Sequence, residues 1–411
     1  MTNFHLYWAS VLALLLGLQK CLANTAPQGC YKLHTDDDWP SFQEWENGIP
    51  GVVKENNSDR FGSLPDYRIR ARSYTDIQAA VKFSALHKIR LSVITTGHDQ
   101  IGRNIAGSGL IIDLSLLQAA RVLESFNATM EGVQSLEHNE KPQTIVPTPG
   151  VQAAVTFNPA FNGLELNKAL DLSGLFVVGG TYAGVAAAGG FGQSGGYGPL
   201  SAQYGLGVDQ WLEAKVVTPD GQLLVANEVS NPELFWAIRG GGGSTFGVVV
   251  EATCHAIHPD QLANVDDANA IWGPILTTMQ SFPGMSLFQS KHFHFSSYPE
   301  FYDTTYGRSN DPPIPTNHGN VPYDSHLLSA DHLRSPDLTH ALSGTGGSYG
   351  ALMTSPGITV GDGKDTAANP GWRNATLLLN GFKSNTTNVD GLRELAPGMG
   401  TYINEVQTPP Y

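Results

Sequence analysis

The sequence predicts an α+β fold in which a large, glycine-rich part is followed by a smaller one. Residues 75–114 contain apolar runs of helix and strand length, and residues 211–225 have the alternation and turn of an antiparallel hairpin. The chain of 411 residues is 41% hydrophobic and contains 46 glycines, which allows a substantial core and favours turns and strands over a helical bundle. Its length suits two or three domain-sized units.

The first α/β unit begins with a predicted helix over residues 75–89. Thr75 and Gln78 have the spacing of a capping box, and apolar residues recur on one face of the helix. Short apolar runs at residues 91–95 and 110–114 predict two buried strands. We therefore expect a small subdomain that presents the turn between these strands.

That turn, after the first strand, reads Thr-Thr-Gly-His-Asp-Gln over residues 95–100. A small-residue turn at a strand end exposes successive backbone N–H groups, and such a nest can hold a pyrophosphate. His98 lies inside the nest. A single loop histidine is more often solvated or hydrogen-bonded than functional, so this turn acquires a meaning only from the motifs that follow it.

A hairpin is predicted in the second part of this region. Residues 211–217 alternate, Pro219-Asp220-Gly221 predicts a turn, and residues 223–225 return as a strand. Residues 248–255 predict a further strand. Beyond residue 257 periodic runs become scarce, and no internal repeat is present.

Residues 190–195 match the pattern GxGxxG, and Asp209 follows near the spacing of a ribose-binding acid. A dinucleotide-binding site of this type needs the third glycine to open a helix. Here Gly-Tyr-Gly-Pro over residues 196–199 breaks a helix, which argues against that site. Two interpretations stay open: glycines that only serve turns, and glycines that let the backbone approach a flat ligand. The glycines at 240–243 favour a tight turn beside a ligand over a flexible linker.

Three blocks in order carry a resemblance: residues 95–114, residues 189–209 and residues 231–249. Together they resemble the fungal secreted branch of the FAD-linked oxidases, the berberine-bridge-like enzymes with a PCMH-type (vanillyl-alcohol-oxidase) FAD-binding domain. The resemblance implies a two-subdomain, PCMH-type FAD-binding fold over residues 64–259. A shortened α+β substrate lobe would follow over residues 260–411.

In that family the histidine of the first block carries FAD covalently, so the resemblance implies this role for His98. Some members attach FAD a second time through a cysteine, but residues 180–186 contain none, and a single attachment is expected. The other residues that the resemblance places at the cofactor are Thr95, Thr96, Gly97, Asp99, Gln100, Gly180, Gly189, Gly190, Gly195, Gly196, Tyr197, Gly198 and Val249.

The resemblance further implies two-electron oxidation of a small molecule with O2 as the electron acceptor. Secondary-metabolite and carbohydrate substrates are equally open. Tyr402 and Glu405, in Tyr-Ile-Asn-Glu, are the candidate catalytic residues. The family continues past this segment, whereas this chain stops at Tyr411, so we expect a C-terminal truncation. The alternative function is a flavin-binding protein that this loss has weakened or inactivated.

The N-terminus predicts export. Residues 1–23 have the apolar run and small-residue cleavage site of a signal peptide, and a polar lead-in follows over residues 24–63. Sequons at Asn56, Asn127, Asn374 and Asn385 predict N-glycosylation of a secreted protein. No later segment is long and apolar enough to predict a membrane anchor.

The net charge and the cysteine and histidine residues limit which partners and metal sites the sequence predicts. The net charge of −14 disfavours nucleic acid and anionic membranes as partners. After cleavage Cys30 and Cys254 remain, and whether they pair is open. His292 and His294 would share one face of a strand, but a metal needs a third ligand and none is evident. No metal site is therefore predicted.

Overall fold

The computed structural model describes residues 31–55, 64–105, 107–182, 184–258, 265–281, 295–305, 323–346, 349–354, 365–382, 384 and 386–405. The predicted signal peptide, Cys30, two of the sequons (Asn56 and Asn385) and the His292–His294 pair lie outside these residues. The side chains of Asn127 and Asn374, in the other two sequons, are exposed.

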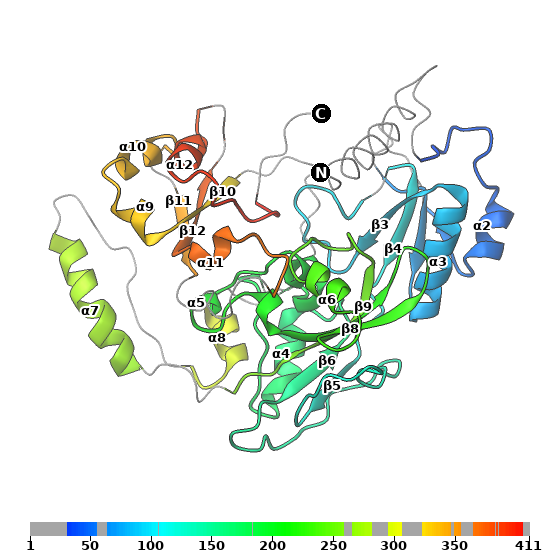
Figure 1. Ribbon diagram of the computed structural model, residues 1–411, viewed down its shortest axis with the longest axis horizontal. Helices are drawn as coiled ribbons and strands as arrows, with labels where there is room; N and C mark the ends of the chain where they lie inside the picture. Colours follow the sequence, from blue (N-terminus) through cyan, green and yellow to red (C-terminus); the bar gives the residue numbers. More distant parts are fainter. Residues whose placement is uncertain are drawn as a thin grey trace, which may run out of the picture.

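The first sheet has the order β1-β2-β4-β3. Its strands are β1 (Val53–Lys54), β2 (Tyr67–Arg70), β4 (Gly109–Asp113) and β3 (Arg90–Ile94), and β4 pairs in parallel with β2 and β3. Helix α3 (Tyr74–His87) connects β2 to β3 and also touches β7 (Trp211–Val217) of the second sheet, whose hairpin partner is β8 (Leu223–Asn227). The predicted strand–helix–strand unit is therefore present (Figure 1).

The start of α3 corrects one detail of the prediction. The capping box is formed by Ser73 and Asp76, so the helix begins one residue before Thr75. Gln78, expected in the box, instead donates from Nε2 to the Gly221 carbonyl in the β7–β8 turn at 2.8 Å. The box was misplaced because Ser73-x-x-Asp76 satisfies the same geometry as Thr75-x-x-Gln78, and a sequence pattern does not rank the two.

The second sheet is antiparallel, in the order β5-β6-β9-β7-β8. Its strands are β5 (Ala120–Leu123), β6 (Ala154–Phe157), β9 (Val248–His255), β7 (Trp211–Val217) and β8 (Leu223–Asn227). The β7–β8 hairpin confirms the predicted one, with Gly221 at a φ of +76° in its turn. Cys254 is buried in β9, where burial raises the pKa of its thiol.

Short helices connect these strands. They are α2 (Phe42–Gly48), α4 (Gly163–Asp171), the π-helix η1 (Ala187–Phe191), α5 (Ser201–Tyr204), the 3₁₀-helix η2 (Gly207–Gln210) and α6 (Pro232–Ile238). The elements of both sheets contribute to two apolar cores, one centred on the antiparallel sheet and one on the α2–α3 side.

The C-terminal part has a sheet of its own, which the sequence did not reveal. Its antiparallel order is β10-β12-β11, with β10 (Tyr323–Leu328), β12 (Leu377–Phe382) and β11 (Tyr349–Met353). Its helices are α7 (Val265–Ser281), α8 (Tyr298–Thr305), α9 (Ala330–Arg334), α10 (Leu338–Ser343), α11 (Gly371–Asn374) and α12 (Asp390–Leu395). In Figure 1 the sheet and α9–α12 form a separate lobe beside the first two sheets, while α7 stands apart.

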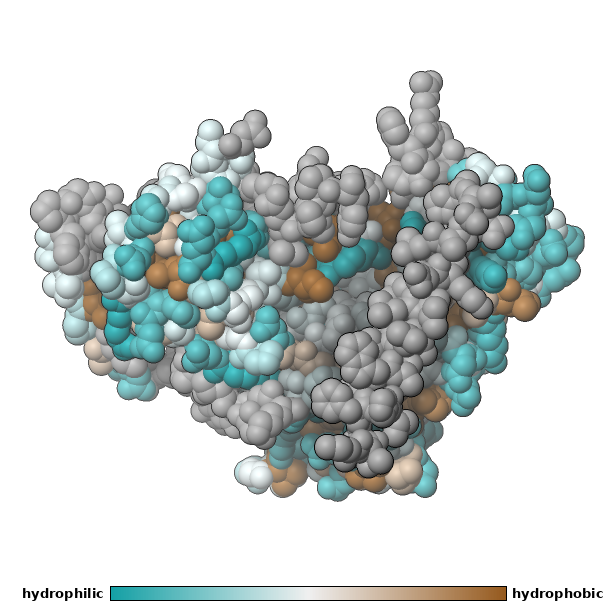
Figure 2. All heavy atoms as spheres, turned by 45° about the horizontal axis from the view of Figure 1, so that its top comes forward, coloured by the Kyte–Doolittle hydropathy of each residue, from teal (hydrophilic) through white to brown (hydrophobic). Residues whose placement is uncertain are grey.

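The visible face in Figure 2 is mostly hydrophilic, with hydrophobic residues in scattered patches. Among the described residues, no helix has both the length and the apolar character needed to cross a membrane. The mixed helix and strand content confirms the predicted α+β class.

Candidate functional site

A cavity of about 1150 Å³ lies between the first two sheets and the C-terminal residues 402–405. Its wall is built from α3 and β3, the turn at residues 95–104, residues 180–197, the ends of β7 and β9, and the C-terminal residues 402–405. The volume is slightly above the range of about 300–1,000 Å³ that is usual for ligand pockets. The cavity therefore has room for a large, extended ligand.

The His98 turn forms part of this wall. All six predicted residues from 95 to 100 line the cavity. Gly97 has a φ of +80°, which a glycine adopts without strain, and the Thr96 hydroxyl accepts from the Ala186 amide at 3.4 Å. The His98 ring is 5.0 Å from the Tyr182 ring.

Burial lowers the pKa of His98, against the opposing effect of a hydrogen bond to the Gly184 backbone. The neutral imidazole is therefore favoured at neutral pH, and a neutral imidazole has a nitrogen lone pair that can attack an electrophile or accept a hydrogen bond.

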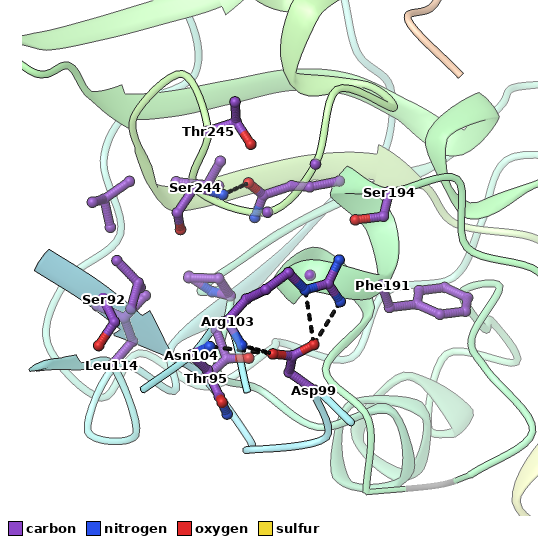
Figure 3. A pocket seen from close by; sticks show the side chains of 18 of the residues that line it. Ser92, Thr95, Asp99, Arg103, Asn104, Leu114, Phe191, Ser194, Ser244 and Thr245 are labelled. Atoms are coloured by element: carbon purple, nitrogen blue, oxygen red, sulfur yellow. Dashed lines mark hydrogen bonds and ion pairs between the residues drawn. The ribbon is translucent and has the colours of Figure 1, made fainter. Parts of the chain in front are cut away.

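Asp99 lines the cavity and also shapes the turn. One carboxylate oxygen accepts from Arg103 Nε at 2.9 Å, and the other accepts from the Asn104 amide at 3.2 Å and from the Arg103 amide. Figure 3 shows the Asp99 and Arg103 side chains pointing toward one another. Asp99 therefore clamps the turn, and its implied role at the cofactor stays a prediction.

Asn104 is a cavity residue that the sequence did not single out. Its side chain is buried, with 7% of the residue exposed, yet neither its amide oxygen nor its amide nitrogen has a hydrogen-bond partner among the described residues. The hydroxyls of Ser84 and Ser92, also on the cavity wall, are buried without partners too. Buried polar atoms are almost always paired, so these groups indicate where a ligand presents its own polar atoms.

The predicted glycines divide into two groups. Gly180 and Gly190 line the cavity, together with Tyr197 and Val249. Gly189, Gly195, Gly196 and Gly198 are not on the cavity wall, and close packing leaves no room for a Cβ at Gly189, Gly196 and Gly198. A Cβ on Gly189 would lie 2.7 Å from Thr95 Oγ1, and one on Gly198 would lie 2.1 Å from the Gly179 carbonyl oxygen.

The GxGxxG segment ends a helix instead of opening one. Residues 187–191 form η1, and the chain then turns through Gly195 and Gly196 at φ values of +112° and +78°. Asp209 does not line the cavity and binds Arg373 at 2.6 and 2.8 Å. The geometry therefore argues against a Rossmann-type site at this GxGxxG segment, as the helix-breaking residues indicated.

Gln193 joins two glycine segments of the wall. Its amide nitrogen donates to the Ala188 and Gly189 carbonyls at 3.2 and 3.3 Å. Its amide oxygen accepts from the Ser244 amide at 3.1 Å (Figure 3). No sequence pattern marked this residue, because its partners lie up to 51 positions away.

The C-terminal residues 402–405 close the wall next to the His98 turn. Asn404 donates from Nδ2 to the His98 carbonyl and accepts at Oδ1 from the Gln100 amide, both at 2.9 Å. Tyr402 is buried, and its ring meets the Tyr197 ring edge-on at 4.9 Å. The predicted catalytic pair is thus brought to the cavity, and Asn404 is a residue that the predicted site lacked.

Glu405 accepts a hydrogen bond from the Tyr197 hydroxyl at 2.5 Å. Burial raises the pKa of Glu405 to about 7, against the lowering effect of hydrogen bonds from Tyr197 and Asn380. Burial and the nearby Glu405 charge raise the pKa of Tyr197 well above its usual range. Among the described residues, no group of three or more His, Cys, Asp or Glu side chains could hold a metal ion.

Comparison with known proteins shows which family and which fold this chain resembles. Residues 65–227 match the family described as FAD binding domain. The chain is 33% identical over 249 residues to the flavin-dependent oxygenase ucdF of Aspergillus ustus, a match that covers 56% of this chain and 42% of that protein. It is 39% identical over 200 residues to the FAD-linked oxidoreductase easE of Claviceps purpurea, covering 48% of this chain and 38% of that protein. The chain thus matches less than half the length of these curated relatives.

Among solved structures, the VAO-type flavoprotein MtVAO713 from Myceliophthora thermophila C1 has a TM-score of 0.76 at 18% identity, covering 92% of this chain and 90% of that one. At this identity the likeness shows the fold. It confirms the predicted fold, that of the PCMH-type, VAO-like FAD-binding proteins.

Proposed function

We propose that this protein is an FAD-dependent oxidoreductase that removes two electrons from a small molecule. The observation that carries the proposal is the cavity itself, with a half-buried His98 in a glycine turn, whose pKa burial lowers, and with the Asn104 amide, unpaired among the described residues, also on its wall. The match of residues 65–227 to the FAD binding domain family supports the choice of cofactor.

The residues present fit FAD. The unpaired Asn104 amide and the backbone of the His98 turn would hold polar oxygens such as those of the diphosphate. At Gly190 a Cβ would meet nothing within 4 Å, so the wall offers a flat surface at close approach. When bound, FAD supplies the two-electron redox chemistry, and the protein supplies binding and orientation.

His98 is the proposed attachment residue. Its depressed pKa favours the neutral imidazole that a covalent bond to the flavin requires, and Asn404 fixes the backbone of the turn. The absence of cysteine from residues 180–186 supports a single attachment.

The remaining parts of the proposal rest on the sequence. We propose O2 as the electron acceptor, secretion after cleavage near residue 23, and glycans at Asn56, Asn127, Asn374 and Asn385. The relatives named above as FAD-linked oxidoreductase and flavin-dependent oxygenase favour an active enzyme over a weakened flavin-binding protein. Secondary-metabolite and carbohydrate substrates are both compatible with the cavity.

Acid precipitation of the secreted protein tests the proposal. The denatured wild type should retain flavin fluorescence in the pellet, and His98→Ala should release it to the supernatant. His340→Ala, at an exposed histidine of α10, is the matched control and should retain the flavin. A wild type that is purified without flavin, and does not take up added FAD, would exclude the proposed function.

A further inference from the structure

Tyr182 and residues 184–186, here called the Tyr182 segment, contact the His98 turn beside the cavity. The Val185 amide donates to the Tyr182 carbonyl at 3.0 Å. The Val185 carbonyl accepts from the Gly163 amide, at the start of α4, at 2.9 Å. The segment is therefore fixed to α4 as well as to the turn.

Two contacts of this segment act on the His98 side chain itself. The Tyr182 ring lies 5.0 Å from the imidazole ring at an angle of 57°, within the range of favourable aromatic pairs. The Gly184 backbone forms a hydrogen bond with the imidazole that opposes the lowering of its pKa by burial. A hydrogen bond that favours the protonated imidazole accepts from a ring N–H, so the partner is the Gly184 carbonyl.

This hydrogen bond determines which ring nitrogen of His98 carries the proton. In a neutral imidazole one nitrogen carries a proton and the other a lone pair. Because the Gly184 carbonyl accepts from the first nitrogen, the lone pair is held on the second. The tilted Tyr182 ring limits rotation of the imidazole, which would break the hydrogen bond.

The backbone of His98 is held separately from its ring. The His98 carbonyl accepts from Asn404 Nδ2 at 2.9 Å, and the charges next to it in the chain, Asp99 and Arg103, are paired with each other at 2.9 Å. The C-terminal residues thus hold the backbone of the turn, and the Tyr182 segment orients the imidazole. A change at Tyr182 should therefore alter the ring without moving the turn.

We propose that Tyr182 is a positioning residue that holds His98 in the orientation and tautomer needed for bonding to the flavin, an inference that rests on the proposed function. In that step the His98 nitrogen with the lone pair forms a bond to a methyl carbon of the flavin. One methyl C–H bond and the imidazole N–H bond break. Their two protons and the electron pair of the C–H bond reach O2, which becomes hydrogen peroxide.

The Gly184 carbonyl assists the same step. Positive charge develops on the imidazole as its lone pair enters the new bond, and the carbonyl oxygen stabilises this charge through the N–H that it already accepts from. Tyr182 acts through His98, so its removal should lower the rate of flavin attachment and leave the affinity for FAD unchanged.

The test compares Tyr182→Ala and Tyr182→Phe with Tyr74→Ala. Tyr74 is the matched control, because it is an exposed tyrosine at the start of α3 that does not line the cavity. Flavin-free protein is mixed with saturating FAD in air, and acid-precipitable flavin is followed over time. The dissociation constant for FAD is measured by fluorescence quenching in the His98→Ala background, where binding is reversible.

NMR of the flavin-free protein follows His98 directly. The imidazole carbon and nitrogen signals give the tautomer and the pKa, and His98→Ala identifies these signals by their absence. We expect a single tautomer in the wild type, in Tyr182→Phe and in Tyr74→Ala. In Tyr182→Ala we expect a mixture of tautomers and a pKa closer to the ordinary histidine value, because the imidazole is less buried.

Flavin attachment in Tyr182→Ala should be on the order of 10-fold slower than in the wild type, because an aromatic contact that orients a reacting group is lost. Tyr182→Phe keeps the ring and should react within about twofold of the wild-type rate. Tyr74→Ala should react at the wild-type rate. All three changes should leave the dissociation constant for FAD unchanged.

Four results would overturn the inference: wild-type attachment by Tyr182→Ala, an unchanged His98 tautomer in that variant, attachment by Tyr182→Phe as slow as by Tyr182→Ala, or an FAD affinity that falls in step with the rate. Each of them leaves the proposed function standing. A wild type that binds FAD only reversibly would overturn attachment at His98 together with this inference. A wild type that binds no FAD would instead remove the proposed function.

Discussion

Two buried polar regions of this molecule differ in their hydrogen bonds: in one the buried polar side chains are paired, and in the other several of them are not. On the antiparallel sheet, Lys215 of β7 binds Glu251 of β9 at 2.9 Å, and Glu213 accepts from the Asn227 side chain and the Val133 amide, both at 2.8 Å. None of these side chains has an unpaired buried atom. On the cavity wall, Asn104, Ser84 and Ser92 have buried polar atoms that find no partner within the part of the chain that the structure describes.

The difference distinguishes polar groups that hold the chain together from polar groups that are free to bind a ligand. The first cluster fixes residues 129–136 against the sheet, since the backbone amides of Val133 and Leu136 donate to its carboxylates. The unpaired atoms of Asn104, Ser84 and Ser92 make no hydrogen bond to any described segment of the chain. A polar group that is unpaired among the described residues and also lines a cavity is therefore a better indicator of a binding site than a buried charge or an unpaired group away from the cavity, such as the Tyr204 hydroxyl.

The largest expected effect comes from breaking the satisfied cluster. Lys215→Met leaves the Glu251 carboxylate buried without its counter-charge, and we expect a loss of about 3–5 kcal/mol in the free energy of unfolding. The double variant Lys215→Met/Glu251→Leu should recover most of this loss, because it removes both charges. Denaturant unfolding measures both variants. Equal losses in the two would show that the ion pair is not what holds the cluster.

A pH dependence follows from Glu405 on the cavity side. Its folded-state pKa of about 7 lies above the ordinary value of 4.5, so the folded protein binds this proton more tightly than the unfolded chain. The contribution to stability is fully present below about pH 4.5 and is lost as the pH rises through about 7, with a total of at most about 3 kcal/mol. Unfolding of Glu405→Gln should lack this slope. A variant that keeps the wild-type pH profile would assign the slope to another group.

Asn404 tests whether the C-terminal residues shape the His98 turn. Asn404→Ala removes the hydrogen bonds to the Gln100 amide and the His98 carbonyl and a third from the Arg103 side chain, and should reduce the free energy of unfolding by about 1–3 kcal/mol. It should also slow covalent flavin attachment, measured as the fraction of precipitable flavin over time. Asn388→Ala, at a second asparagine of the same lobe, should leave the attachment rate unchanged. A normal rate of flavin attachment in Asn404→Ala would show that the C-terminal residues do not shape the His98 turn.

The smallest effect on the free protein is expected at Asn104. Because its amide has no partner to lose, Asn104→Leu should change the free energy of unfolding of the flavin-free protein by less than about 1 kcal/mol. In a His98→Ala background, where FAD binds reversibly, the same change should weaken FAD binding on the order of 10-fold, by loss of hydrogen bonds to the ligand. If Asn104→Leu destabilises the flavin-free protein and leaves the FAD affinity unchanged, then Asn104 has a structural role, like the polar cluster on the antiparallel sheet.

Sequence by itself determined the features that depend on neighbouring residues. The β3–turn–β4 unit and its His98 nest, the β7–β8 hairpin and the helix break after Gly196 all follow from local apolar spacing and from glycine and proline chemistry. The C-terminal sheet escaped prediction because β10 reads Tyr-Asp-Ser-His-Leu-Leu, in which three consecutive polar residues are buried and no alternation appears.

Tertiary structure alone decided which polar groups meet and which remain unpaired. Asn404 reaches the His98 turn across about 300 positions, and Glu405 reaches Tyr197 across 208. Such partners are chosen by packing of the sheets and not by spacing along the chain. The unpaired amide of Asn104 has the same origin, because only the packed structure determines which polar groups come within hydrogen-bond distance of it.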